Sequence, residues 1–305
     1  MKHLSYSFTT TVEFSEAVSD HSFVLRCMPA ARPGQNVSAN LLLDPPARFS
    51  LQRDSFGNVL VCGSIEPGHA SFSYKSYGEA DVDAAGGVPE PAHPAFLFPS
   101  ELTHVSEQME TWVRSVGFGR EAAATGGTAA TSGASGMASA DHATAQATLE
   151  GCLSLTHALH DRIRYEPGST DVSTKAADAF AQGAGVCQDF AHIMVALLRH
   201  KGIPARYVCG ITEGEGATHA WAQAHIGGRW HGFDPTRGQA CDDSYLMIAC
   251  GRDWADCPVE RGVFRGSASQ TQTVFMEVCV WLAEPRKTPR SMGQSAQSRP
   301  QAIIR

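Results

Sequence analysis

Cys187 follows a glycine-containing turn and begins a segment with helical periodicity. The spacing i, i+3, i+4, i+7 and i+8 is occupied by Phe190, Ile193, Met194, Leu197 and Leu198, which predicts one buried stripe of an amphipathic helix. Gly183 and Gly185 permit a tight turn, so we expect Cys187 in the first helical turn. Unpaired backbone N–H groups there favour a thiolate and can stabilise an oxyanion. This position suits a nucleophile, although the cysteine alone is also compatible with a packing role.

A second feature lies downstream, where Gly227-Gly228 separates two alternating runs and predicts a two-residue β-hairpin. With the flanking residues paired, His219 and Asp234 project from the same face, diagonal to each other. Taken singly, His219 could be a strand histidine and Asp234 could open the Asp-Pro-Thr turn. Together they offer an imidazole and the carboxylate that fixes its tautomer. The order Cys187, His219, Asp234 therefore predicts a cysteine-nucleophile triad.

The composition narrows the class of protein. A chain of 305 residues is long enough for one large or two ordinary domains. Its nine cysteines form no CxxC pair and no zinc-type spacing with histidine, and no EF-hand, HExxH or Walker sequence occurs, so we expect no metal and no cofactor. The net charge of −7 argues against a nucleic-acid partner. The first residues lack the apolar region of a signal peptide and no run approaches about 18 apolar residues, so we expect a cytoplasmic protein without a membrane partner.

Residues 1–88 have the pattern of an all-β domain. From Leu4 to Phe14 apolar and polar residues alternate, as they do in a half-buried strand. Five further short strand-like runs follow, separated by turn signals such as Asp-Pro-Pro. We expect a small β-sandwich, followed by a linker at 86–94.

Residues 95–285 are expected to form the second domain, which contains helices and strands. Besides the segment that begins at Cys187, helical patterns cover 106–116, 152–163 and 174–180. Between the first two, residues 122–148 hold one charged and one large apolar side chain, so little can offset the entropy of ordering them. We expect a flexible surface loop there.

The segment 286–305 differs in charge from the rest of the chain. It contains five Lys or Arg residues and no Asp or Glu, and it is rich in Ser, Gln and Pro. This composition predicts a disordered basic tail.

Several of these motifs resemble one known family. The stretch GVCQDFAHIMVALLRHKGIPARYVCG followed by HAWAQAHIGGRWHGFDPT is similar to the core of the transglutaminase-like superfamily, in the bacterial branch related to papain-like cysteine proteases. The resemblance covers at least 174–238. The strand-rich beginning with DSFGN resembles the β-domain of bacterial members, and GRDWADCPVERGVFRG resembles their carboxy-terminal part. Only 122–148 departs, being longer and simpler than the usual connection. The resemblance implies an α+β fold, with helices packed on an antiparallel sheet after a small all-β sandwich.

The resemblance also implies the roles of the candidate residues. Cys187 is expected to be the nucleophile, His219 the general base and acid, and Asp234 the orienting carboxylate. The backbone N–H of Cys187 is the first expected oxyanion donor. Gln182 is a second candidate because papain-like enzymes place a glutamine upstream of the cysteine, but it could equally be an exposed turn residue, and transglutaminases often use an aromatic residue. Asp189 is expected to stabilise the helix start.

The implied reaction acts on an amide bond of a peptide or protein substrate through a thioester. Water as acceptor gives hydrolysis and an amine gives transamidation. Animal transglutaminases look larger, with further β-domains after the core, whereas about 50 residues separate Asp234 from the basic tail. We therefore expect a peptidase or isopeptidase, with a transamidase or a non-catalytic peptide-binding module as alternatives. Calcium dependence is not expected.

Overall fold

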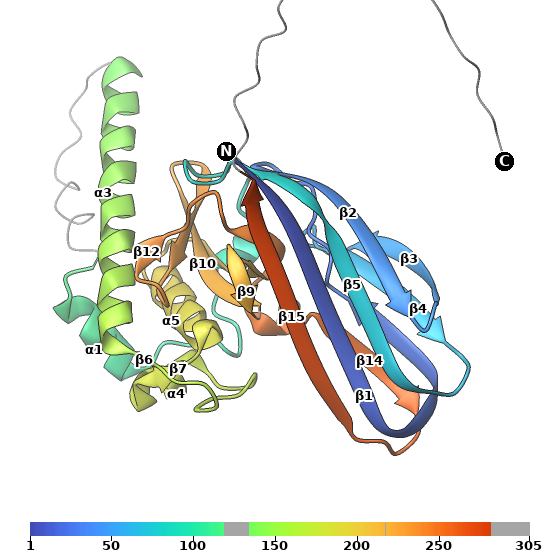
Figure 1. The fold of residues 1–305 in the computed structure, drawn as a ribbon. Coiled ribbons are helices and arrows are strands. Elements are labelled where there is room, and N and C mark those ends of the chain that lie inside the picture. Colours follow the sequence, from blue (N-terminus) through green and yellow to red (C-terminus); the bar gives the residue numbers. More distant parts are fainter. Residues whose placement is uncertain (119–133, 217, 282–305) are drawn as a thin grey trace, which may run out of the picture.

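A computed structural model describes residues 1–118, 134–216 and 218–281. Two β-sheets dominate it, and the helices gather beside the smaller sheet (Figure 1). This is the α+β arrangement expected from the sequence, with a β-domain followed by a mixed core. Within the described part of the chain, no helix is long and apolar enough to span a membrane.

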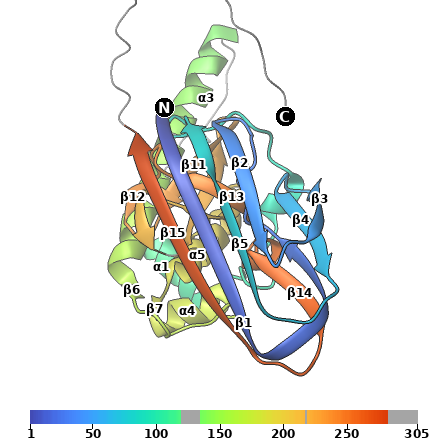
Figure 2. The same ribbon diagram turned by 45° about the vertical axis from the view of Figure 1, so that its right-hand side comes forward.

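The larger sheet has eight strands and is organised around β1. One layer has the order β2 (Gln35–Asp44), β5 (His69–Val82), β1 (Lys2–Leu25), β15 (Gln270–Trp281), β9 (Gly214–Gly216). The second layer joins the end of β1 to β4 (Val59–Ile65) and β14 (Glu260–Arg265), with β3 (Arg48–Arg53) beside β4. All of these pairs are antiparallel, and β1 runs through both layers (Figure 2).

The alternation from Leu4 to Phe14 is confirmed as one strand face, since its apolar residues are buried. The pairing of β1 with β5 is irregular between Glu13 and Val18, where the strand passes from one layer to the other. Apolar side chains from both layers then share one core, as when the Phe23 and Phe72 ring centroids lie 4.9 Å apart. The β-domain is thus a sheet curled onto itself.

The expected domain boundaries need one correction. The strands β14 and β15, which we assigned to the core between 95 and 285, pair with β1 and complete the β-domain. Their register places Met276 opposite Phe8 inside the β-domain core. Pairing between segments so far apart in sequence leaves no local signal.

The core domain is built on a five-stranded antiparallel sheet. Its order is β12 (Gln239–Ala240), β11 (Arg229–Asp234), β10 (His219–Ile226), β8 (Ala205–Ile211), β13 (Leu246–Gly251). Within the described residues, the helices beside it are α1 (Glu107–Ser115), α3 (Ala134–Arg162), α4 (Ala176–Gln182) and α5 (Cys187–His200). The short strands β6 (Arg164–Tyr165) and β7 (Ala184–Gly185) pair in parallel, and single 3-10 turns occur at η1 (Pro94–Leu97) and η2 (Trp254–Asp256). Helix α5 packs on β10 and β8 and carries the apolar stripe that its sequence predicts.

The low-complexity segment also needs correction. Residues 134–148, expected as part of a flexible loop, form the first half of α3, whose upper end projects away from the core (Figure 1). Alanine has the highest helix propensity, so an alanine-rich segment can extend a helix that is anchored further along. The rest of that expected loop, 122–133, and the basic tail 286–305 lie outside the described residues.

The role of β15 predicts unequal effects of truncation at two neighbouring residues. Met276 is 3% exposed and Phe275 is 52% exposed. Met276→Ala should lower the free energy of unfolding by about 2–5 kcal/mol, because it leaves a cavity in the β-domain core. Phe275→Ala, the matched control, should change it by less than about 0.5 kcal/mol. Denaturant unfolding followed by circular dichroism measures both, and equal losses would contradict the assignment of β15 to that core.

Candidate active site

Cys187 is the first residue of α5, as the sequence predicts. Its turn is held by Asp189, whose Oδ2 accepts hydrogen bonds from the backbone N–H of Val186 at 2.8 Å and from Thr170 Oγ1 at 2.6 Å. The expected helix-stabilising role of Asp189 agrees with these bonds. Gly185 has no room for a side chain, because an added Cβ would lie 2.7–2.9 Å from the Asp189 carboxyl group and its Cβ. The first-turn N–H of Cys187 has no intrahelical acceptor and faces the start of the helix.

The predicted hairpin brings His219 and Asp234 together. Ile226 pairs with Arg229 and Ala222 with Phe233, which is the register expected from a two-residue turn. Both turn glycines have positive φ angles, 58° and 78°, a conformation that side chains with a Cβ rarely adopt. In this register His219 Nε2 lies 2.7 Å from Asp234 Oδ2.

Asp234 is fully buried and saturated with hydrogen bonds. Its Oδ2 also accepts from the Tyr245 hydroxyl at 2.8 Å, and its Oδ1 accepts from the backbone N–H groups of Thr236 and Arg237 at 3.0 and 3.1 Å. Burial alone would raise the pKa of Asp234, but the hydrogen bond and charge of His219, followed by the Tyr245 and Arg237 bonds, hold it below its usual value. The carboxylate is therefore ionised and fixed in place.

His219 contacts both other members of the predicted triad. Since Nε2 faces Asp234, Nδ1 is the ring nitrogen left for the side chain of Cys187, which lies near enough to raise the pKa of His219. Burial alone would lower the pKa of His219. The hydrogen bonds to Asp234 and Cys187, and the negative charge of both, raise it to about 9. The imidazolium form is thus favoured beside the thiol.

The environment of Cys187 differs from that of the cysteines packed in the interior. Cys187 is only partly buried, whereas burial raises the pKa of Cys209 and of Cys152 to about 12 and keeps those thiols protonated. Tyr165 lies close enough that the charge of Cys187, after burial, contributes to raising the pKa of its phenol. Tyr165 comes from β6, which pairs with the turn before α5, and its side chain is 54% exposed.

The structure separates Gln182 from the triad. Gln182 ends α4 with an exposed side chain, and its Nε2 donates to the carbonyl oxygen of Ser169 at 3.0 Å. Trp221 is buried, with its ring centroid 6.4 Å from that of His219. It packs behind the imidazole.

Sequence reasoning missed two tyrosines that belong to this region. Tyr245 follows Asp234 by eleven residues in a loop, and Tyr165 precedes Cys187 by 22 residues on a two-residue strand. Neither position carries a local pattern, because the tertiary fold alone places them. Among the described residues, no group of three or more His, Cys, Asp or Glu side chains is arranged to hold a metal ion.

Comparison with known proteins assigns the family. Residues 137–235 match the family model of the transglutaminase-like superfamily, and residues 4–81 match the bacterial transglutaminase-like N-terminal region. A crystal structure from Cytophaga hutchinsonii, described as a "putative cysteine protease", has a TM-score of 0.66 and 23% identity over 93% of both chains, so it shares the fold.

Curated relatives include uncharacterized proteins of Mycobacterium leprae and Mycobacterium tuberculosis. The first is 37% identical over 127 residues, 38% of this chain and 45% of the relative, and the second is 38% identical over 125 residues, 36% of this chain and 40% of the relative. The matched region therefore spans less than half of these relatives. The two matched regions follow each other along the chain, and the second contains Cys187, His219 and Asp234. The chain therefore belongs to the transglutaminase-like superfamily, with a bacterial-type N-terminal region ahead of the core.

Proposed function

We propose that this protein is a cysteine-dependent amide-bond hydrolase, a peptidase or isopeptidase that acts on peptides or proteins through a thioester. The observation that carries the proposal is the contact chain from Cys187 at a helix start through His219 to the buried Asp234. A thiol, an imidazole and a carboxylate in this order are the parts that a cysteine nucleophile requires. A module that only binds peptides does not need a thiol, an imidazole and a carboxylate lined up next to one another.

The first chemical step joins the Cys187 sulfur to the substrate carbonyl carbon. His219 holds the thiol proton as imidazolium, and Asp234 supports that charge and fixes the ring. Collapse of the tetrahedral intermediate breaks the C–N bond while His219 gives its proton to the departing amine. Water, deprotonated by His219, then cleaves the thioester and restores the thiol.

The oxyanion of the intermediate needs donors near the sulfur. The backbone N–H of Cys187 is one, at the positive end of α5. We assign the second to the phenol of Tyr165, because Tyr165 pairs with Gly185 in the turn directly before Cys187, whereas the amide of Gln182 is bonded to Ser169. An aromatic second donor is the alternative to Gln182 that the sequence analysis kept open.

Exposure around the site favours water as the acceptor. The side chains of Tyr165 and Val172 are 54% and 51% exposed. Val172 lies beside the site, because its carbonyl accepts a hydrogen bond from the amide of Gln188 in the first turn of α5. The strands that follow Asp234, β12 to β15, are all paired within the two sheets. A site open to water favours hydrolysis over transfer to an amine.

The main test measures how the thioester partitions. An activated glutamyl or peptide donor is supplied with amine at about millimolar concentration, and free acid and amine adduct are quantified by mass spectrometry. The wild-type protein should release mostly free acid. Cys187→Ala should form neither free acid nor amine adduct, and it should keep the wild-type melting temperature. Mostly amine adduct would make the protein a transamidase, and turnover by Cys187→Ala would remove Cys187 from the mechanism.

The raised pKa of His219 predicts the alkaline limit of activity. The imidazolium is lost as pH rises through about 9, so kcat/KM should fall there. Asp234→Asn removes the carboxylate that raises this pKa and should move the alkaline limb down by about one pH unit or more. Asp83→Asn, at a side chain 73% exposed in the β-domain, is the control and should leave the limb in place. If the alkaline limb of the kcat/KM profile stayed in place in Asp234→Asn, the assigned role of Asp234 would be contradicted.

The oxyanion assignment predicts that two variants near Cys187 differ. Tyr165→Phe should lower kcat by about 100-fold with little change in melting temperature, because it removes one half-exposed hydroxyl donor. Gln182→Ala should stay within about twofold of wild type. Steady-state kinetics on both variants decides the matter: a large loss in Gln182→Ala with a normal Tyr165→Phe would reverse the assignment.

A further inference from the structure

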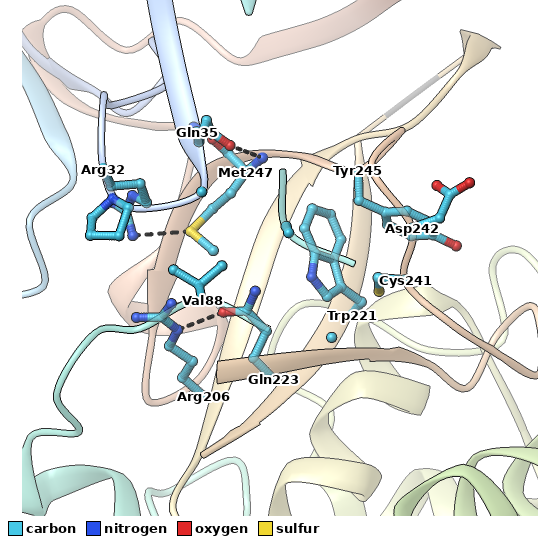
Figure 3. Close-up of a pocket in the computed structure, with 14 residues that line it drawn as sticks. Arg32, Gln35, Val88, Arg206, Trp221, Gln223, Cys241, Asp242, Tyr245 and Met247 are labelled. Carbon is cyan, nitrogen blue, oxygen red and sulfur yellow. Dashed lines mark hydrogen bonds between the residues drawn. The ribbon is translucent and has the colours of Figure 1, made fainter. Parts of the chain in front are cut away.

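A pocket lies on the face of the core sheet opposite α5 (Figure 3). Residues 220, 222 and 224 of β10 pack in the α5 cluster, and the alternating residues Trp221 and Gln223 line the pocket instead. Arg32, in the chain between β1 and β2, and Gln35, the first residue of β2, also line the pocket. None of Cys187, His219 and Asp234 is among the residues that line it.

The pocket is small and partly open. It encloses about 440 Å³ between side chains, including the part that opens to solvent. About 30 Å³ can hold the centre of a water molecule, roughly twice what one water requires, so an occupant has only a few heavy atoms.

Hydrogen-bond donors without acceptors line this space. The indole Nε1 of Trp221 and the amide Nε2 of Gln223 have no partner among the described residues, although both side chains are at least 95% buried. Both nitrogens lie on the pocket side of their side chains in Figure 3. Neither nitrogen belongs to the fully buried unpaired atoms, so both are reachable from the pocket, and a bound acceptor would complete their hydrogen bonding.

Arg32 is the least satisfied cation of the pocket. Its Nη1 donates to two sulfur atoms, Met247 Sδ at 3.0 Å and Cys250 Sγ at 3.3 Å, which are weak acceptors. Its Nη2 donates to the Gly57 carbonyl at 3.4 Å and to Asn58 Oδ1 at 3.5 Å, and both of these bonds are long. Its buried Nε has no partner, and no carboxylate of the described chain lies within 4.0 Å of it. By contrast, Arg206 has Glu90 at 2.9 Å and the Gln223 Oε1 at 2.7 Å.

The charged side chains that line the pocket give it a positive electrostatic character. Asp242 is the one acidic residue among the residues that line the pocket. Lys2 Nζ lies 2.9 Å from its Oδ2, and Ser244 donates to its Oδ1. Arg32 thus faces the pocket without a counter-charge.

We propose that this pocket binds the carboxylate group of a small organic acid. The guanidinium of Arg32 supplies a positive charge without a counter-charge, and the Trp221 and Gln223 N–H groups supply donors for the oxygens of a carboxylate. Val88 and Met247 give the pocket an apolar wall that suits a short carbon tail better than a fully hydrated inorganic anion. One lining residue, Tyr245, also donates to Asp234, so the carboxylate would lie directly behind the triad.

Acetate and its neutral isostere acetamide provide the test. The indole N–H resonances of the ¹⁵N-labelled protein are followed while either compound is added at constant ionic strength, up to about 100 mM, and the Trp221 signal is assigned with Trp221→Phe. Acetate should shift this signal saturably and acetamide should not. Equal responses to both, no saturable shift with acetate, or the same shift with sodium sulfate would overturn the proposal.

A pair of arginine variants adds a second readout by titration calorimetry. Arg32→Met should weaken acetate binding about tenfold or more, because it removes the charged fork. Arg53→Met is the matched control, since Arg53 donates to the Gly57 carbonyl beside the pocket but is exposed and does not line it. Unchanged affinity in Arg32→Met would contradict the assignment, and the wild-type titration decides it even if that variant fails to fold.

Discussion

The hydrogen bond between His219 and Asp234 depends on the register of one hairpin. A slip by one residue would turn Asp234 to the opposite face of β11 and leave His219 without its carboxylate. The two glycines at the turn, with positive φ angles, fix that register. The buried carboxylate in turn keeps His219 charged beside Cys187, so a turn at the far end of the hairpin determines the electrostatics of the site.

The parts of the site that could be predicted from the sequence are those with local signals. The apolar stripe after Cys187 placed the thiol at the start of α5, and the Gly-Gly turn placed His219 and Asp234 in contact. Both inferences needed only the 3.6-residue period of a helix and the two-residue period of a strand. The β-domain at the beginning of the chain followed from the same alternation.

The parts that could not be predicted depend on long-range packing. Strands β14 and β15 return to β1 from the other end of the chain, and the alanine-rich residues 134–148 continue a helix. Tyr165 and Tyr245 reach the triad region only through the fold, and neither belongs to a motif. The donors that line the pocket behind the triad come from the β1–β2 connection and from β10, so their convergence is likewise a tertiary property.

The chain holds its cysteines in very different surroundings, and the account requires only one of them to be a nucleophile. Cys62, Cys187 and Cys241 are partly buried and Cys279 is exposed, so solvent access alone would not single out Cys187. The most direct test is alkylation by iodoacetamide at a pH below neutrality, with each site quantified by peptide mass mapping. The account predicts that Cys187 is modified much faster than Cys62 and Cys279, and that His219→Ala removes this difference. Equal rates at Cys187, Cys62 and Cys279 in the wild-type protein would contradict it.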